Sequence, residues 1–239
     1  MQHKNAEVNS LFFSTLEWDD TKKEVPLAQL FPRWTNYVPT LVVLGMVFGG
    51  IGTVALVWYY GSPSFIEVGY RPEQPVPYSH KLHVGELGLD CRYCHVSVEL
   101  SHEANIPPTQ TCMNCHATVK PKSEKLQLVR DSFENNTPIA WVRVHKIPDY
   151  AYFNHSVHIK AGVGCASCHG NVGEMETVEV KAPLSMGWCL ECHRDPQQHI
   201  RPKSEITNMT WEPPPNHADL VKDVMKTLNP PQDCSSCHR

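Results

Sequence analysis

Cys91-Arg92-Tyr93-Cys94-His95 is the first of five copies of one pentapeptide, Cys-x-x-Cys-His. The later copies begin at Cys112, Cys165, Cys189 and Cys234, and together the five use all 10 cysteines of the chain. In this spacing the two thiols form thioethers to a haem, and the adjacent histidine becomes a ligand of the haem iron. The expected thioether residues are Cys91, Cys94, Cys112, Cys115, Cys165, Cys168, Cys189, Cys192, Cys234 and Cys237, and the expected proximal iron ligands are His95, His116, His169, His193 and His238.

Two other chemistries of paired cysteines fit these motifs poorly. A zinc site needs four ligands and usually combines two Cys-x-x-Cys pairs, which would leave one of the five pairs unused. A thioredoxin-like redox pair does not require a histidine after the second cysteine. The sequence therefore predicts a c-type cytochrome with five covalently bound haem c groups.

The composition narrows the class of protein further. The 239 residues carry a net charge of −4 and the pI is near 6.4, which gives no reason to expect a nucleic-acid partner. The chain has 20 prolines and little regular apolar periodicity. We therefore expect a mostly irregular, short α-helical multihaem domain made of cytochrome c3/c7-like dihaem modules. In such a domain the porphyrins supply much of the hydrophobic core.

One apolar run lies ahead of the haem motifs. From Val38 to Tyr60 the chain reads VPTLVVLGMVFGGIGTVALVWYY, without a charged side chain. At about 1.5 Å per residue, a helix of this length exceeds the bilayer core of about 30 Å. A signal peptide is the alternative, but the run is too long, the segment before it is not a short basic region, and no small-x-small cleavage site follows. The sequence predicts an uncleaved transmembrane anchor helix over residues 37–60.

The charges that flank this run indicate its orientation. Three basic residues lie close on its N-terminal side, against Arg71 alone on the other side, which is a mild positive-inside bias. Covalent haem attachment takes place outside the cytoplasm, and every haem motif follows the run. We therefore expect a bacterial inner-membrane protein with a cytoplasmic arm over residues 1–36 and a periplasmic pentahaem domain over residues 61–239.

The run itself carries no ionisable side chain, so we do not expect a quinone site or a proton path made from this helix alone. Gly45 and Gly49 are spaced so that another membrane helix can pack closely against them, which favours polytopic membrane partners. The alternative is that glycine is simply common in membrane helices.

Residues 78–116 and residues 153–193 form an internal repeat. Each half has an aromatic-x-His-x-x-His segment, a short stretch of apolar residues and glycine, and two haem motifs. The fifth motif, residues 234–238, follows as an unpaired addition. Self-similarity on this scale predicts two stacked dihaem modules.

The paired histidines of the repeat are the expected distal iron ligands. Two residues three positions apart on a helix face the same side but diverge by about 60°. Each can then reach a different iron, one in the haem just downstream and the other in a neighbouring haem. His80, His83, His155 and His158 would supply four of the five distal ligands.

The fifth distal ligand is open between two residues. Met186 lies three residues before Cys189, where a tight turn would fold its sulfur over a haem, and His145 lies just ahead of the second repeat. A lone methionine is more often a packing residue. A thioether ligand would raise the potential of its haem above those of the bis-histidine haems. The weaker candidates are His102, His199 and His217.

The supply of strong ligands also indicates the class of function. A haem enzyme that reduces nitrite or hydroxylamine needs an open or weakly held iron position, whereas these residues can close all five irons. The sequence therefore predicts electron transfer, and we expect no catalytic residue and no catalysis from this chain alone.

Six strings of the sequence resemble the pentahaem cytochrome subunits (ActA) of bacterial alternative complex III: residues 70–80, 91–95, 106–116, 141–145, 152–158 and 183–189. The resemblance implies an electron-transfer subunit of a respiratory or photosynthetic membrane complex, in which a separate polytopic subunit oxidises quinol. The implied electron acceptor is a monohaem cytochrome, a soluble carrier or a terminal oxidase. Members of the family combine bis-histidine haems with a histidine/methionine haem, which favours Met186.

Two alternative functions share these features. One is a quinol dehydrogenase of the NapC/NrfH type, which has one anchor helix and acts without polytopic partners. The other is a multihaem reductase that acts on a small oxyanion and keeps one haem five-coordinate.

Overall fold

The computed structural model describes residues 31–238. The chain divides into two compact units, Met1–Ala55 and Leu56–Arg239, with the boundary inside the first long helix. We describe the helix and the haem-motif region separately.

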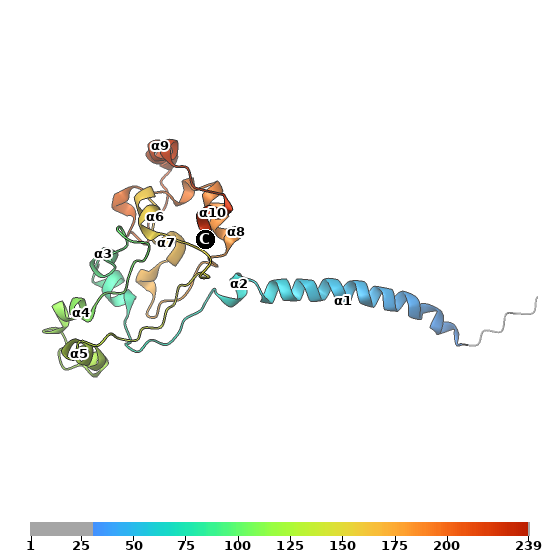
Figure 1. Ribbon diagram of the computed structural model, residues 1–239, viewed down its shortest axis with the longest axis horizontal. Coiled ribbons are helices and arrows are strands. Elements are labelled where there is room, and N and C mark those ends of the chain that lie inside the picture. The colour runs from blue at the N-terminus through green and yellow to red at the C-terminus, as the bar shows by residue number, and fades with distance from the viewer. Residues whose placement is uncertain (1–30, 239) are drawn as a thin grey trace, which may run out of the picture. The chain divides into compact units, whose positions relative to one another are not determined.

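The apolar run forms a single helix. A 3₁₀ turn, η1 (Arg33–Tyr37), leads into α1 (Val38–Tyr60), which Figure 1 shows as unbroken. None of the side chains of α1 is buried, although most of them are apolar. Among the described residues, this is the one helix long and apolar enough to cross a membrane. An apolar helix that is exposed all round needs a membrane or partner helices to cover it.

Beyond α1 the described chain is made of short helices and irregular segments, as the sequence predicts. The longest of these helices, α9, has 11 residues. The pairing between extended segments described up to residue 238 consists of two isolated bridges, Ala151 with His238 and Val163 with Ile200. The helices are α2 (Pro63–Ile66), η2 (Lys81–Glu86), α3 (Cys91–Cys94), α4 (Thr109–His116), η3 (Glu124–Leu126), α5 (Gln127–Glu134), α6 (His155–Ala161), α7 (Ala166–His169), η4 (Val172–Glu174), α8 (Met186–Arg194), η5 (Gln197–His199), η6 (Lys203–Glu205), α9 (His217–Thr227) and α10 (Cys234–Cys237).

Each haem motif lies on one of the short helices, namely α3, α4, α7, α8 and α10. One helical turn places cysteines three residues apart on the same side of the chain. Side-chain caps start three of these helices: Asp90 accepts from Arg92 N, Ser185 from Trp188 N and Asp233 from Ser236 N. An acid or a hydroxyl at this position satisfies an amide that the helix leaves free.

The segment just ahead of the first repeat lies along the segment that follows the third motif. Gly69 N donates to Val180 O (2.8 Å), and Val180 N donates to Tyr70 O (3.0 Å). Further along, a Cβ atom on Gly85 would lie 2.2 Å from the carbonyl oxygen of Gly173. Only glycine allows η2 and η4 to approach this closely.

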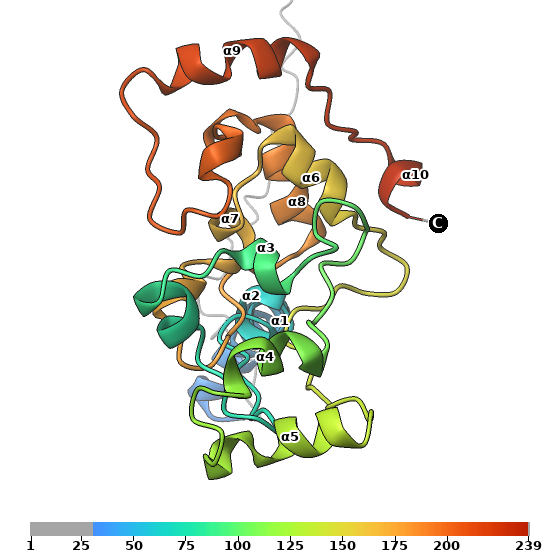
Figure 2. The same ribbon diagram turned by 90° about the vertical axis from the view of Figure 1, so that its left-hand side faces the viewer.

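The C-terminal motif is hydrogen-bonded to the residue just before the second repeat, since Tyr152 N donates to Cys237 O at 2.7 Å. The second repeat in turn contacts the first, because His155 N donates to His102 O (3.2 Å). Figure 2 shows α4 and α5 at one end of this unit, α3 and α7 in the middle, and α8, α9 and α10 towards the other end.

The polypeptide core of this unit is thin. Among the described residues, the buried apolar side chains include no aromatic residue, and the largest fully buried ones are Ile200 and Val221. A chain of this size normally buries aromatic side chains in its core. The thin core fits a domain whose interior is filled largely by cofactors. The buried apolar residues are Val76, Val129, Ile159, Met175, Val180, Ala182, Ile200, Ile206 and Val221.

Candidate haem-binding site

The two aromatic-x-His-x-x-His segments have nearly the same geometry. The ring of Tyr78 lies 4.7 Å from His80 at 84° and 4.5 Å from His83 at 21°. The ring of Phe153 lies 4.8 Å from His155 at 86° and 4.4 Å from His158 at 31°. In each repeat the aromatic ring therefore contacts one imidazole edge-on and the other at a small angle, stacked in the first repeat and tilted in the second.

The helices under the two segments differ. In the second repeat, α6 starts at His155 with Asn154 as its cap, whereas the first repeat forms the π-helical turn η2 after His80. There Leu87 N donates to Leu82 O, five residues back. The second histidine is nevertheless held in the same way in both: His83 Nδ1 donates to Ser79 O (2.8 Å) and His158 Nδ1 to Asn154 O (2.7 Å).

Four of the five motif histidines bind a backbone carbonyl through Nδ1. The distances are 2.5 Å for His95 to Asn105 O, 3.0 Å for His116 to Val119 O, 2.7 Å for His193 to Pro231 O and 3.1 Å for His238 to Tyr150 O. Because a carbonyl oxygen only accepts hydrogen bonds, Nδ1 must carry the proton. A neutral imidazole then has its free lone pair on Nε2, which is the arrangement of a metal-ligating histidine.

Three of the distal-ligand candidates face a motif histidine at a nearly constant distance. The ring centres are 6.2 Å apart for His83 and His116, 6.4 Å for His155 and His169, and 6.1 Å for His158 and His193. An imidazole nitrogen binds a metal at about 2 Å, and the ring centre lies roughly 1 Å further out, so two rings on opposite sides of one metal ion have centres about 6 Å apart. These three pairs therefore fit around an iron.

His80 lies beside the first motif. Burial, followed by the neighbouring His95 and His83, lowers the pKa of His80 to about 4. Its Nδ1 is buried without a hydrogen-bond partner. Burial also lowers the pKa of His158 and lowers that of His169 to about 3. These histidines are therefore neutral at physiological pH, which is the protonation state that binds a metal.

The structure places the two candidates for the fifth ligand in different surroundings. The ring of His145 lies 4.4 Å from that of His169, too close for an iron between them, and its Nε2 is buried without a partner. Met186 begins α8, and its side chain is 66% exposed. The ring neighbour of His238 is Tyr150, at 5.8 Å.

The three weaker candidates for the fifth distal ligand do not face a motif histidine in the contacts described. His217 is buried and its Nε2 lies 2.7 Å from Ile200 O. The ring of His102 stacks on Tyr152 at 6.3 Å, and its carbonyl accepts from His155 Nδ1 (2.8 Å). His199 ends the short turn η5.

The five motifs form a row in the order second, first, third, fourth and fifth. Asn114 Nδ2 donates to the Tyr93 hydroxyl (3.1 Å), which joins the second motif to the first. The side chains of Cys91 and Cys165 lie close enough for each to shift the pKa of the other, which brings the first motif next to the third. The views of α4, α3, α7, α8 and α10 in Figures 1 and 2 agree with this order.

The third, fourth and fifth motifs lie close enough for their cysteines to shift one another's pKa. Burial raises the pKa of Cys168, and the nearby Cys192 and Cys189 raise it further. Burial also raises the pKa of Cys189, and the nearby Cys237 contributes to the rise. Consecutive motifs in the row are thus adjacent along its whole length.

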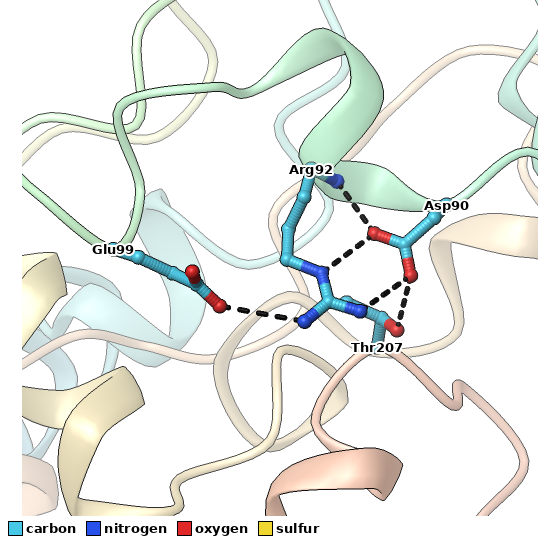
Figure 3. A network of polar contacts seen from close by, with 4 residues as sticks. All are labelled: Asp90, Arg92, Glu99 and Thr207. Atoms are coloured by element: carbon cyan, nitrogen blue, oxygen red, sulfur yellow. Dashed lines mark hydrogen bonds and ion pairs between the residues drawn. The ribbon is translucent and has the colours of Figure 1, made fainter.

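A polar network connects the first motif to the loop near the third (Figure 3). Arg92 binds both carboxylate oxygens of Asp90, at 2.8 and 2.9 Å, and reaches Glu99 at 3.4 Å. Thr207 donates to Asp90 Oδ2 at 2.8 Å. The hydrogen bonds from Arg92 are the main reason that the pKa of Asp90 is lowered to about 2. An aspartate just before a Cys-x-x-Cys-His motif is a sequence signal for this cap that our sequence analysis missed.

We expect Asp90→Ala to lower the free energy of unfolding by about 1 kcal/mol at pH 7, because it removes a helix cap. The ion pair between Asp90 and Arg92 is partly exposed, so it adds little to the free energy of unfolding. Asp90→Asn keeps the cap and should cost less. Because the folded-state pKa of Asp90 is below its usual 3.8, the contribution of the charge is present above pH 3.8 and is lost as the pH falls towards 2. Denaturant unfolding followed by circular dichroism measures both; equal stability of Asp90→Ala and wild type would contradict the prediction.

The residues present fit covalently bound haem. The cysteines lie in pairs on short helices, motif histidines have Nε2 free, and partner imidazoles face them across a gap of the size an iron needs. Comparison with known proteins agrees with this geometry. Residues 151–239 match the family described as cytochrome c7 and related cytochrome c.

Residues 151–239 form a cytochrome c7-like domain. The cytochrome c7-like domain comprises the second repeat and the C-terminal motif, so three of the five motifs belong to it. The first repeat, residues 78–116, precedes it in the chain and reproduces its paired-histidine geometry.

A curated relative extends the comparison beyond the cytochrome c7-like domain. The chain is 29% identical over 169 residues to the multihaem cytochrome c subunit of menaquinone reductase from Nitratidesulfovibrio vulgaris, with 62% of this chain and 79% of the relative covered. This chain is therefore a homologue of a multihaem cytochrome c subunit.

Proposed function

We propose that this chain is the electron-transfer subunit of a membrane complex that oxidises quinol, and that it carries five haem c groups. The observation that carries the proposal is the row of five motifs, in which three motif histidines each face a histidine of the repeats with ring centres 6.1–6.4 Å apart. Each haem would supply a one-electron Fe(III)/Fe(II) couple. The menaquinone reductase relative supports a role linked to quinone.

One histidine of a repeat and one motif histidine would together supply the two protein ligands of each of four irons. The first histidine of each repeat serves the first motif of that repeat, His80 with His95 and His155 with His169. The second histidine serves the second motif, His83 with His116 and His158 with His193. Six of these eight imidazoles, all except His80 and His169, are oriented by a carbonyl bond at Nδ1, which would also increase the basicity of Nε2 towards iron. With histidines supplying both protein ligands, these irons would have no free position for an oxyanion, which argues against the reductase alternative.

For the fifth iron we propose Met186 as the distal ligand opposite His238. His145 is adjacent to His169, which already has His155 at the spacing of an iron pair. The fourth and fifth motifs are neighbours, since Pro231 O accepts from His193 Nδ1. Met186 begins the helix of the fourth motif with its side chain exposed on that helix.

We expect Met186→Leu to convert one of the five haems to a high-spin form, because leucine has no atom that binds iron. His145→Ala is the matched control and should leave all five haems low-spin. Electron paramagnetic resonance of the oxidised protein measures both. The opposite result, with a high-spin haem only in His145→Ala, would assign the ligand to His145.

The anchor helix α1 would hold the chain in the bacterial inner membrane, with residues 1–36 in the cytoplasm and the haem motifs in the periplasm. The lack of charge in α1 and the exposure of its side chains support an anchoring role. Quinol oxidation would belong to polytopic partner subunits, and a monohaem cytochrome, a soluble carrier or a terminal oxidase would accept the electrons. Residues 1–30 of the arm lie outside the described residues.

The name of the relative suggests a second candidate, in which electrons run from the periplasm to menaquinone. One experiment separates the two directions and also tests the NapC/NrfH alternative. The intact complex and the separated chain are each mixed with a menaquinol analogue, and haem reduction is followed by absorbance. Rapid reduction in the complex alone supports the proposal. Reduction of the separated chain supports the NapC/NrfH alternative, and reduction in neither preparation supports the reverse direction.

A further inference from the structure

Arg201 is a buried cation in the loop that follows the fourth motif. Only 7% of the residue is exposed, and its Nε has no hydrogen-bond partner. Arginine keeps its charge at any pH at which a protein is folded. A buried guanidinium with a free N–H is costly unless something nearby benefits from its charge.

The contacts of Arg201 do not neutralise its charge with an ion pair. Burial lowers the pKa of Arg201, although the Glu205 carboxylate lies close enough to oppose this shift. Its Nη1 donates to Asn208 O (3.0 Å) and is 3.5 Å from Glu205 O, and its guanidinium lies 4.6 Å from the centre of the Trp211 ring. In the part of the chain that the structure describes, no carboxylate forms an ion pair with Arg201. The carboxylate of Glu205 instead accepts a hydrogen bond from Asn208 Nδ2 (2.8 Å).

The guanidinium lies against the backbone just before the third motif. A Cβ atom on Gly164 would be 2.1 Å from Cζ of Arg201, so this approach requires glycine. The next residue, Cys165, is fixed by its own amide, which donates to Ile206 O (3.0 Å). Arg201 is also close enough to affect the Cys165 thiol electrostatically. The charge therefore lies at the thioether edge of the third motif, in the middle of the row.

We propose that Arg201 raises the reduction potential of the haem attached to Cys165 and Cys168. Adding an electron to iron makes the haem less positive, so a nearby fixed positive charge favours the reduced form. Burial keeps solvent and salt from screening the charge. The inference rests on the proposed haem at this motif, but not on the direction of electron flow or on the identity of the complex.

A purely structural role for Arg201 makes a different prediction. If the residue only supports the loop through its bonds to Asn208 O and Glu205 O, then Arg201→Lys and Arg201→Gln should disturb the haem alike. If its charge tunes the potential, lysine should preserve most of the effect and glutamine should remove it. Gly164→Ala provides a third variant, because the added methyl group must push the guanidinium away from Cys165.

The test is a spectroelectrochemical titration of the purified complex, with haem content measured first for every variant. In Arg201→Gln we expect one haem to be about tenfold harder to reduce at a given potential, equivalent to a midpoint lower by about 59 mV. Gly164→Ala should shift the same haem in the same direction, and Arg201→Lys should shift it much less. The exposed Arg71, replaced by glutamine, should cause no shift.

The inference is overturned if the midpoints in Arg201→Gln match those of the wild type, or if lysine and glutamine shift them equally. If Arg201→Gln does not accumulate, the other two variants decide. A wild-type midpoint in Gly164→Ala overturns the inference, whereas a lowered midpoint in Gly164→Ala with little change in Arg201→Lys supports it. Wild-type protein with unmodified Cys165 and Cys168 would contradict the haem assignment itself.

Discussion

Replacing Cys234 and Cys237 with alanine should reduce the haem content from five to four per chain. The two thiols are the attachment points of one haem, and a lone histidine does not retain it covalently. The last motif suits this test because α10 is exposed or half-buried and follows the rest of the domain. Haem content per chain and intact mass both measure the loss, and the other four haems should retain their spectra.

The matched control for this experiment changes the residues between the same cysteines. Ser235→Ala with Ser236→Ala removes two side-chain bonds to Asp233 but keeps both thiols and His238. This variant should still carry five haems. Five haems in the cysteine variant would contradict the role of the C-terminal motif, and a wild-type count other than five would contradict the proposed number of cofactors.

Replacing His158 with alanine should turn one low-spin haem into a high-spin haem that binds carbon monoxide. His158 faces His193 with the ring centres 6.1 Å apart, and its Nδ1 is held by Asn154 O, so its loss leaves one iron position open. Electron paramagnetic resonance should show one high-spin haem per chain. Titration of the reduced protein should bind one carbon monoxide, against none in the wild type.

His102→Ala is the control for the loss of an imidazole in the same domain. His102 is exposed, and its ring contacts Tyr152 rather than a motif histidine. We expect five low-spin haems and no carbon monoxide binding in this variant. An unchanged spectrum in His158→Ala would mean that another side chain closes the iron opposite His193, and the proposed pairing would be wrong.

Much of this protein follows from short-range patterns in its sequence. The five pentapeptides, the repeated aromatic-x-His-x-x-His segment and the apolar run are local features. The structure places the first on short helices, the second in two similar aromatic–histidine contacts and the third on α1. The fold class of short helices with a cytochrome c7-like domain was predicted for the same reason. Thioether attachment and helix formation depend on residues a few positions apart, and sequence spacing reports such distances directly.

Other features depend on contacts between segments far apart in the chain. The histidine spacing predicts that each pair diverges, but not which motif each ring faces. That depends on contacts between distant segments, as when His102 O accepts from His155 Nδ1 and Pro231 O accepts from His193 Nδ1. The order of the motifs in the row is likewise set by long-range contacts such as Thr207 with Asp90.

The five Cys-x-x-Cys-His copies by themselves thus determined the chemistry of the cofactor, because covalent attachment needs only local spacing. Only the tertiary structure decided which imidazoles face each other and brought the charge of Arg201 beside Cys165, 36 positions earlier in the chain. The physical reason is that the loop from Ile200 to Trp211 folds back onto the third motif through backbone bonds, and no local pattern in the sequence encodes the partner of a backbone carbonyl.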